Sequence, residues 1–507
     1  MFFLKPLRRE CIDKKTVFKT YGIVLVTINK GSTIEKRMTI ENINIDTTLK
    51  RVEDLLKEDK DLSPGTKSLL EILVLIITLM ANRLNLNSKN SSKPPASDPN
   101  RKKTNKKKTD KKPGGQKGHI GKTLEKIETP DKIKVIKLDR AKLPPGKYTD
   151  LGYESRQVFD IDISRVVTEY QAQVLEDKNG KRFTAPFPQG VTKAVQYGAS
   201  LKAHSVYMSQ FQLIPYDRVK DYFVDQLGIP VSAGSVFNFN KEAFGLLEGF
   251  DELVKNKLAG SALLHSDETG INVNGKRFWL HSASNLFWTY FSPHEKRGTE
   301  AMNAIGILPN FKGILCHDHW KPYYRYDCTH ALCNAHHIRE LTRAWEQDGQ
   351  QWAQKLQGLL EEINREVNNA GGSLSASEAT KYRQRYRLIL KEAEKESPPP
   401  DESKRKGKRG RLKRTKSRNL LERLRDYEED VLRFMDNEIV PFTNNLGEND
   451  IRMTKVQQKI SGCFRSKEGA QFFCRIRSYI STCRKQDISS TTALDLLFQG
   501  KLPNFTA

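Results

Sequence analysis

The clearest pattern in the chain is a series of three short apolar runs near its middle, which is typical of consecutive β-strands. Ala262 to Leu264 form the first run, and Asn274-Gly275 then supply the two-residue turn that closes β-hairpins. The next runs, Arg277 to Ser282 and Leu286 to Phe291, are rich in Phe, Trp, Leu and Tyr. Asp267 follows the first run, so the pattern predicts an acidic side chain where the first strand ends.

Helical periodicity precedes these strands. From Thr47 to Leu86 apolar residues recur at helix spacing, with an interruption at Ser63-Pro64-Gly65. This segment is interpreted either as a dimerising coiled coil or as a helical hairpin that packs on its own chain. The apolar run from Ile72 to Ala81 is too short for a membrane span, so it predicts a buried helix.

A second helical pattern resembles a helix-turn-helix. Tyr216 to Leu227 predict one helix, Gly228-Ile229-Pro230 the turn, and Ser232 the cap of a second helix that reaches Phe244. A DNA-reading role competes with a structural role, in which these helices pack in front of the strands that follow. The structural role is favoured, because the second helix offers few basic side chains.

These patterns predict a mixed α/β fold. Its ribonuclease-H-like core carries a helical insertion and follows helical and small β-rich regions. The expected segments are a poorly patterned extension (1–46), a helical region (47–90), a basic Pro/Gly/Lys linker (91–125), a small β-rich module without cysteine (126–190), a helical segment (191–260), the first part of the core (261–345), the helical insertion (346–440), the last part of the core (441–490) and a tail (491–507).

Charge is concentrated in two internal stretches. The 507-residue chain has 86 Lys and Arg against 61 Asp and Glu, a net charge of +25, and residues 101–122 and 404–418 carry nineteen of these charges. Such stretches on a nearly balanced chain indicate a polyanion partner, nucleic acid before membrane. The candidate DNA-binding residues in them are Lys106, Lys107, Lys108, Lys111, Lys112, Lys404, Arg405, Lys406, Lys408, Arg409 and Arg411.

The cysteines indicate a reducing compartment. Seven are spread along the chain without CxxC spacing, which favours free thiols over a disulfide framework. The first residues lack the cleavage pattern of a signal peptide. We therefore expect a cytoplasmic protein with no membrane partner.

Two further acids complete a candidate catalytic set. Asp318 follows the apolar run Gly313 to Cys316, and Glu448 lies in a predicted helix, where Arg452 and Lys455 share its face at i+4 and i+7. Phosphoryl transfer by two divalent ions needs converging carboxylates, and oxygen ligands suit Mg²⁺ or Mn²⁺. Alternatives remain open: Glu268 competes for the first position and Asp327 for the second, whereas Asp450 points away from the face of Glu448.

Several longer motifs carry a family resemblance. They are NSKNSSKPPASD with KKPGGQKGH (87–119), LHSDET (264–269), CHDHW (316–320), CNAHHIREL (333–341) and NNLGENDIRMTKVQQKISGCFRS (444–466). With these motifs the chain resembles the transposases of the insertion sequence 66 family, which have an Asp-Asp-Glu core. The resemblance implies Asp267, Asp318 and Glu448 as the metal-binding triad and Lys455 as a basic residue near the DNA.

The resemblance also bears on zinc. Cys333 and His336 match a Cys-x-x-His signature found after the second Asp in related transposases, and we expect them to brace the sheet near the site. A zinc site formed with the nearby Cys328 and His330 is disfavoured, because four ligands within nine residues would be cramped. The absence of cysteine from 126–190 departs from the zinc module that family members commonly carry at that place.

The function expected from these residues is DNA transposition by metal-dependent strand cleavage and strand transfer. The implied partners are double-stranded DNA, a second copy of the chain and accessory proteins encoded by the element, in a bacterial cytoplasm and associated with the nucleoid. Two alternatives stay open: a ribonuclease-H-like nuclease or resolvase that cuts without joining, and a non-catalytic DNA-binding descendant of a transposase.

Overall fold

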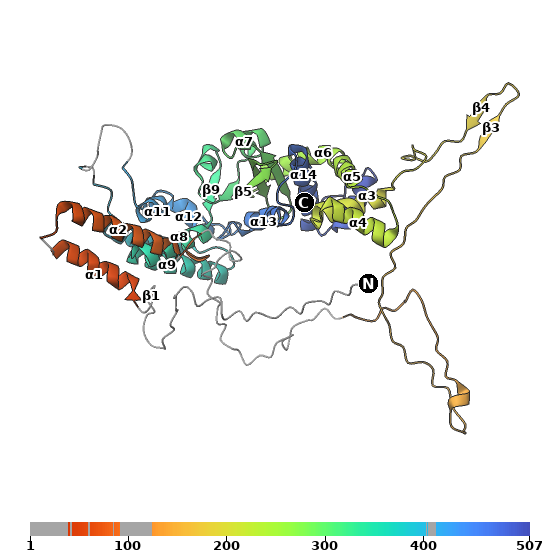
Figure 1. The fold of residues 1–507 in the computed structure, drawn as a ribbon, viewed down its shortest axis with the longest axis horizontal. Coiled ribbons are helices and arrows are strands. Elements are labelled where there is room, and N and C mark those ends of the chain that lie inside the picture. The colour runs from red at the N-terminus through yellow and green to blue at the C-terminus, as the bar shows by residue number, and fades with distance from the viewer. Residues whose placement is uncertain are drawn as a thin grey trace, which may run out of the picture. The chain divides into compact units, whose positions relative to one another are not determined.

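The computed structural model describes residues 39–40, 43–58, 61–84, 86–91, 124–401, 403 and 412–506. This part of the chain has a mixed α/β fold, as predicted, and Figure 1 labels many of its elements. It divides into two compact units, each formed from segments far apart in the sequence. The first comprises the described residues of 1–103, 336–362 and 380–426, and the second those of 104–335, 363–379 and 427–507.

A five-stranded sheet in the order β7-β6-β5-β8-β9 forms the centre of the second unit. Strands β5, β6 and β7 are antiparallel, and β8 and β9 run parallel to β5. Asn274 and Gly275 turn between β5 and β6 with positive φ angles of 49° and 78°, which confirms the predicted hairpin. The strands are β5 (Leu263–Val273), β6 (Lys276–Ser284), β7 (Thr289–His294), β8 (Ile314–His317) and β9 (Thr329–Leu332).

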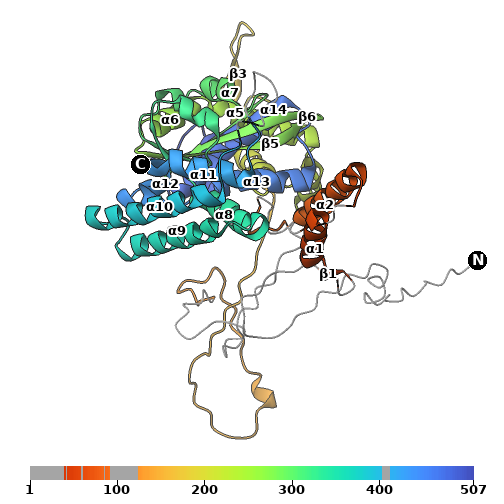
Figure 2. The same cartoon turned by 90° about the vertical axis from the view of Figure 1, so that its left-hand side faces the viewer.

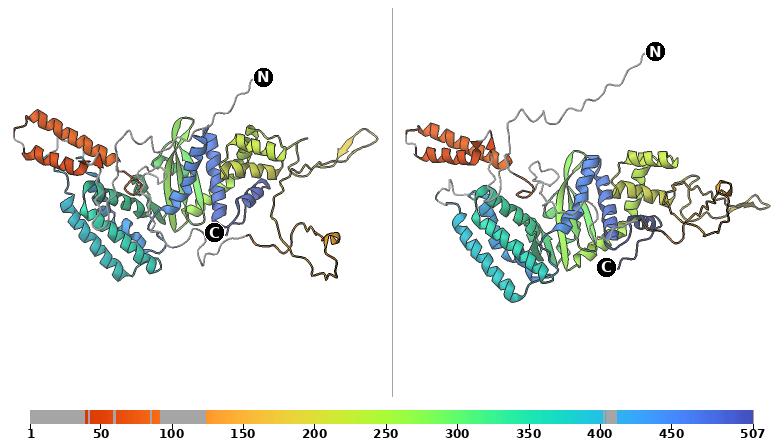
Figure 3. Two further views of the ribbon diagram at one scale, coloured as in Figure 1. Left: turned by 60° about the horizontal axis from the view of Figure 1, so that its bottom comes forward. Right: turned by 90° about the horizontal axis from the view of Figure 1, so that it is seen from below.

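Helix α13 (Asn445–Ser461) packs against β5 and β6, and α14 (Lys467–Lys485) packs along the edge strand β7. Figure 3 shows α14 between the sheet and the helices that precede the sheet in the sequence. Two α14 hydroxyls, from Ser478 and Thr482, accept hydrogen bonds from backbone N–H groups of the edge strand β7. The helix thereby satisfies donors that an open sheet edge would leave unpaired.

The predicted helix-turn-helix is present, as α4 (Tyr216–Leu227) followed by α5 (Ala233–Leu246). Ser232 caps α5 by accepting a hydrogen bond from the N–H of Ser235. Both Phe237 and Phe244 of α5 contact the ring of Phe472 on α14. Because its apolar side chains lie in the core, these contacts support the structural role for α5.

Further elements complete the second unit around this core. They are η3 (Arg140–Lys142), β3 (Val174–Glu176), β4 (Arg182–Thr184), α3 (Ala199–Val206), η4 (Tyr207–Phe211), α6 (Glu248–Ala259), α7 (Thr299–Ile305), η5 (Leu308–Asn310), η6 (Lys321–Arg325), α12 (Glu428–Asp436) and α15 (Ser490–Phe498).

The segment 126–190 differs from the β-rich module that its alternating sequence predicts. Its strands are limited to the three-residue pair β3 and β4, and the expected run from Arg165 to Leu175 is extended without a strand partner over most of its length. Apolar side chains remain largely exposed, among them Leu151 at 95% and Val158 at 91%. Alternation alone did not form a sheet, because no second apolar layer among the described residues covers these side chains.

The first unit is mainly helical, and the segment 346–440, predicted as a helical insertion, is divided between the two units. This unit contains most of α9 (Gln351–Asn369) and α10 (Ala376–Glu396), which are seen side by side in Figure 2 and are joined by ion pairs from Lys355 to Glu392 and from Arg385 to Glu362. The buried Tyr386 donates its hydroxyl to a backbone carbonyl of α11. The remaining elements are β1 (Thr39–Ile40), β2 (Ile43–Asn44), α1 (Ile45–Glu58), α2 (Pro64–Leu84), most of α8 (Asn334–Asp348) and α11 (Lys416–Asp426).

Helix α2 corrects the expectation for the apolar run 72–81. The run is helical, but the helix is not buried: among its described residues Val74 and Ala81 are buried, while Leu75 and Met80 are 57% and 61% exposed. Helix α2 is also long and apolar enough to cross a membrane by length and composition. The expectation considered only the uninterrupted run and therefore underestimated the length of the apolar helix, which extends beyond the run on both sides.

Candidate active site

The pairing of β5 with β8 brings two of the predicted acids together. These parallel strands match Leu264 with Leu315 and His265 with Cys316. Continuing this register by two residues aligns Asp267 with Asp318. Residues aligned in neighbouring parallel strands project from the same face of the sheet, about 4.8 Å apart along the hydrogen-bonding direction. The backbone therefore presents both carboxyl groups on one face.

The position of Asp267 within its strand differs from the prediction. It lies in the middle of β5, which continues to Val273, rather than at a strand end. The strand end that matters is that of β8, which stops at His317. His319 then takes a left-handed conformation with φ of 65°, and the chain turns away. The pairing of β8 with β5 therefore ends before Asp267, whose backbone stays paired with β6 on the other side.

Glu448 lies in the first turn of α13, and Asn444 anchors that end of the helix to β5. Its buried side chain bonds the ring Nδ1 of His265 through Oδ1 at 2.7 Å and donates from Nδ2 to the carbonyl of Ser266 at 2.9 Å. A Cβ on Gly447 would lie 3.1 Å from Asn444 Oδ1 and 3.4 Å from His265 Cβ, so a residue without a side chain allows this close approach.

The electrostatics of the site depend on burial and on the acids around Asp267. Burial first, and then the negative charges of Glu268, Asp318 and Glu448, raise the pKa of Asp267 to about 8. A carboxyl with that pKa holds a proton at neutral pH, because ionising it would add another negative charge to a buried acidic cluster. The structure thus brings together the three acids that the sequence analysis selected.

The competing acids have other partners. Glu268 is buried on β5, where its carboxylate accepts hydrogen bonds from Arg297 and Tyr323. Exposed Asp327 pairs with Lys312 at 2.9 Å. On α13, Asp450 pairs with Lys485 at 2.7 Å, in agreement with its expected direction away from Glu448.

This donor set fits divalent cations. Asp267, Asp318 and Glu448 offer oxygen ligands, the type that Mg²⁺ and Mn²⁺ prefer. The raised pKa of Asp267 shows that burial and the neighbouring acids disfavour its ionised form in the metal-free protein. A bound cation would favour the ionised carboxylate, so the residues suit such an ion both in ligand type and in charge.

The basic residues predicted beside the acids are partly described. Lys455 reaches back from α13 and donates to the carbonyl of Gly270 on β5 at 3.0 Å, while Arg452 is exposed on the same helix. Burial lowers the pKa of Lys455, the charge of Arg277 lowers it further, and Asp267 opposes both effects. The sequence analysis did not single out Arg277, because it is distant in sequence from α13.

The candidate basic residues of the linker and of the insertion lie outside the described residues. They are Lys106, Lys107, Lys108, Lys111, Lys112, Lys404, Arg405, Lys406, Lys408, Arg409 and Arg411. The end of the second basic run is described, and its arginines are paired with acids. Arg414 pairs with Glu422. Arg418, buried at the start of α11, pairs with Glu422 and with Glu394 of α10.

Cys333 lies at the end of β9, close to the start of α13. Its sulfur accepts a hydrogen bond from the backbone N–H of Asn444 at 3.2 Å and lies 3.7 Å from Glu448 Oε1. This contact is consistent with the predicted bracing role of Cys333. His336, the other residue of the signature, belongs to the first compact unit. The six described cysteines are free thiols, as expected.

Replacing Asn444 with Ala should destabilise the protein by about 2–4 kcal/mol, because His265 and the Ser266 carbonyl would lose partners in a buried place. Urea unfolding measures the change. Asn445→Ala is the matched control, since Asn445 is exposed, and it should stay within about 0.5 kcal/mol of the parent. Equal stabilities for the two variants would show that Asn444 does not anchor α13.

Comparison with known protein families identifies the family of the chain. The model of the Transposase IS66 family matches residues 194–472, and a family of unknown function (DUF6444) matches residues 32–125. A search of curated proteins found no match. The first match covers more than half of the chain and contains all three acids, so the chain belongs to the IS66 family of transposases.

Proposed function

We propose that this transposase cleaves and joins DNA strands at a site in which Asp267, Asp318 and Glu448 hold two divalent metal ions. The observation that carries the proposal is the convergence of these acids, which are 51 and 130 residues apart in the sequence: the parallel pairing of β5 with β8 aligns Asp267 with Asp318, and α13, which packs on β5, carries Glu448. Burial, and then the charges of Glu268, Asp318 and Glu448, raise the pKa of Asp267 at that place. Distant acids that converge at such an energetic cost point to a site kept for function.

The sheet supports a ribonuclease-H-like core. Three antiparallel strands in sequence are followed by two that pair in parallel on the far side of the first, in the order β7-β6-β5-β8-β9. This order makes β5 and β8 neighbours, so the acids on them can share ligands. Helix α13 contributes the third acid from the side.

A divalent ion pair, when bound, favours loss of a proton from the attacking hydroxyl and stabilises charge on the attacking and leaving oxygens. The residues of the chain orient that chemistry: Asp267 and Asp318 from neighbouring strands, Glu448 from the helix. Water first breaks a phosphodiester bond and leaves a 3′-hydroxyl at the element end. That hydroxyl then attacks a target phosphodiester, forms the new bond and releases the target's 3′-oxygen in line.

The experiment that tests the proposal supplies purified protein with DNA carrying the element ends and a target plasmid. Mg²⁺-dependent nicking together with covalent joining of the ends to the target is expected. Nicking without joining would favour the nuclease or resolvase alternative. DNA binding with neither reaction would favour the non-catalytic descendant and contradict the proposal.

The basic run in the insertion should contact DNA phosphates. Replacing the six Lys and Arg residues between Lys404 and Arg411 with Gln should lower the slope of log affinity against log salt by about 0.9 for each lost contact. Arg414 and Arg418 are kept, because they pair with acids in the folded protein. Binding titrations across a salt series measure the slope, and an unchanged slope would show that this run does not touch the DNA.

We further propose that the protein acts as a homo-oligomer on double-stranded DNA in the bacterial cytoplasm, at the nucleoid, with accessory proteins of the element as additional partners. The exposed apolar side chains of α2 support self-association through the coiled-coil interpretation of Thr47 to Leu86, while α1 and α2 also pack on each other as in the hairpin alternative. The free thiols support a reducing compartment.

A further inference from the structure

Glu268 is the most enclosed acid of the site, and its oxygens are already bound. Its side chain is 1% exposed. Arg297 donates from Nε and Nη2 to Oε1 at 3.0 and 2.7 Å, and the buried Tyr323 donates its hydroxyl to Oε2 at 2.6 Å. A buried carboxylate of this kind is stable only with such partners. Glu268 is therefore engaged away from any ion that Asp267 binds.

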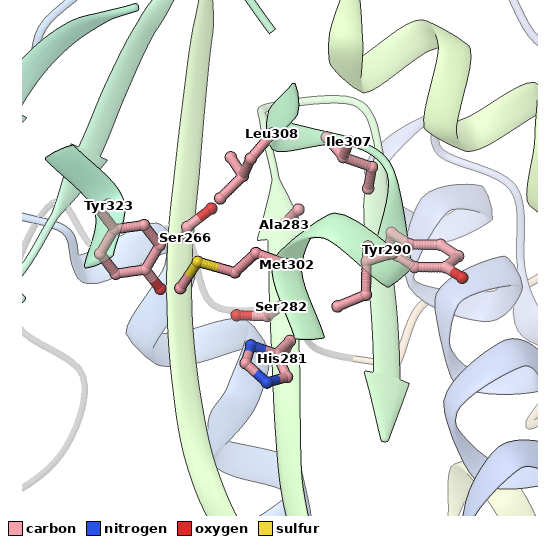
Figure 4. A pocket seen from close by; sticks show the side chains of 10 residues that line it. Ser266, His281, Ser282, Ala283, Tyr290, Met302, Ile307, Leu308 and Tyr323 are labelled. Atoms are coloured by element: carbon pink, nitrogen blue, oxygen red, sulfur yellow. The ribbon is translucent and has the colours of Figure 1, made fainter. Parts of the chain in front are cut away.

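Tyr323 binds Glu268 from another side than α13, the helix that carries Glu448. It lines a small cavity with Ser266, Ala283 and Met302 (Figure 4). Ser266 and Glu268 project from one face of β5, and Asp267 projects from the other. Alternation along the strand explains this arrangement, because successive side chains of β5 project to opposite faces. Asp267 and Glu268, although adjacent, thus belong to two different sets of contacts.

Arg297 connects Glu268 to the segment that carries Asp318. Its guanidinium lies between two indole rings, 4.7 Å from the ring centroid of Trp279 and 4.2 Å from that of Trp320. The backbone N–H of Trp320 donates to Asp318 Oδ1 at 3.1 Å. The contacts therefore run without a gap from Glu268 through Arg297 and Trp320 to the carboxyl group of Asp318.

Asp318 needs such a support. It lies beyond the end of β8, and the next residue, His319, has the left-handed φ of 65°. That conformation is unfavourable for a non-glycine residue and persists where neighbouring contacts hold it. The stacked Trp320, two residues past Asp318, is one of those contacts.

We propose that Arg297 is a positioning residue of the transposase site: anchored by Glu268 and Tyr323, it holds Trp320 and thereby sets the direction of the Asp318 carboxyl group. The inference rests on the proposed function in that it takes Asp318 as a metal ligand. It assigns Glu268 the role of anchoring Arg297, and so answers which of the two neighbouring acids on β5 faces the ions.

Arg297→Lys is the test, because Lys keeps the positive charge but lacks the planar fork that binds one oxygen twice and stacks between two rings. Calorimetric titration of the full chain with Mn²⁺ alone should show metal affinity lowered by roughly 10-fold or more, within the 10–100-fold typical of residues that support metal ligands. Mg²⁺-dependent DNA cleavage should need correspondingly more Mg²⁺. Arg325→Lys is the control, since exposed Arg325 lies nearby in η6, and its Mn²⁺ affinity should not change.

A second variant covers the case in which Arg297→Lys does not fold. Trp320→Leu removes the indole that links Arg297 to the Asp318 segment and leaves the ion pair with Glu268 in place, so Mn²⁺ affinity should again fall several-fold. Wild-type Mn²⁺ affinity in a folded Arg297→Lys or Trp320→Leu protein would overturn the inference. Weaker DNA binding by Arg297→Lys with unchanged Mn²⁺ affinity would also overturn it and make Arg297 a phosphate contact.

The metal and DNA measurements separate this inference from the proposed function. A wild-type protein that binds Mn²⁺ more tightly than its Arg297→Lys variant but neither cleaves nor joins DNA would leave the positioning role standing and refute the function. A wild-type protein that cleaves and joins, together with an Arg297→Lys variant of equal Mn²⁺ affinity, would do the reverse.

Discussion

Glu448→Gln is expected to abolish strand cleavage while leaving DNA binding near the wild-type level. The substitution removes one negative charge from the cluster that acts on Asp267 and keeps the shape of the side chain. Metal-assisted charge stabilisation contributes several kcal/mol to phosphoryl transfer, so cleavage should fall by at least about a thousandfold. The basic residues that meet phosphates are untouched, and gel shifts should therefore match the wild type.

Cleavage and binding have to be measured on the same preparation, with Glu468→Gln as the matched control. Glu468 is an exposed acid of α14, and its ion-pair partner is Lys241, a residue outside the acidic cluster. Its variant should cleave like the wild type. Loss of both cleavage and binding in Glu448→Gln would point to misfolding, and full cleavage would remove Glu448 from the catalytic set.

Asp267→Asn is expected to stabilise the metal-free protein at alkaline pH. The folded-state pKa of Asp267 is about 8, well above the ordinary value of 3.8. Between these values the folded state binds more protons than the unfolded state, so this group makes the wild type less stable as pH rises from about 4 to 8. Asn cannot ionise, and the advantage of the variant should grow over that interval and level off above it.

The size of the effect follows from the pKa shift. Each pKa unit corresponds to about 1.4 kcal/mol, so the variant should gain a few kcal/mol at pH 9, or roughly 5–10 °C in Tm. Because Glu268, Asp318 and Glu448 interact with Asp267, the measured pKa belongs to the acidic cluster as a whole. Thermal unfolding in EDTA from pH 5 to 9 measures the difference.

Divalent metal provides the second half of that test. Adding Mg²⁺ or Mn²⁺ at pH 9 should stabilise the wild type, because a bound cation relieves the repulsion between the carboxylates, and should stabilise Asp267→Asn much less. A variant that is less stable than the wild type at every pH would mean that Asp267 makes favourable contacts, and would contradict the repulsion inferred for the cluster.

Local sequence was sufficient for elements whose chemistry lies within a few residues. The Asn274-Gly275 hairpin and the Ser232-capped helix both formed as predicted, because the left-handed turn and the helix cap are satisfied by neighbours in the chain. The three candidate acids could also be selected from local sequence. Two of them follow apolar runs, and the third lies on a helix with basic residues, so no knowledge of the fold was needed. Longer apolar alternation was a weaker guide, as the exposed segment 126–190 shows.

Tertiary structure decided how those acids relate to one another. The sequence left Asp267 and Glu268 as competitors, because both follow the same apolar run. Strand alternation and contacts with Arg297 and Tyr323, 29 and 55 residues away, separated them. The same holds for Asn444, whose bonds to β5 span almost 180 residues. Burial and the pKa of Asp267 arise from such distant neighbours, and local sequence carries no record of them, because they depend on which segments the folded chain brings into contact.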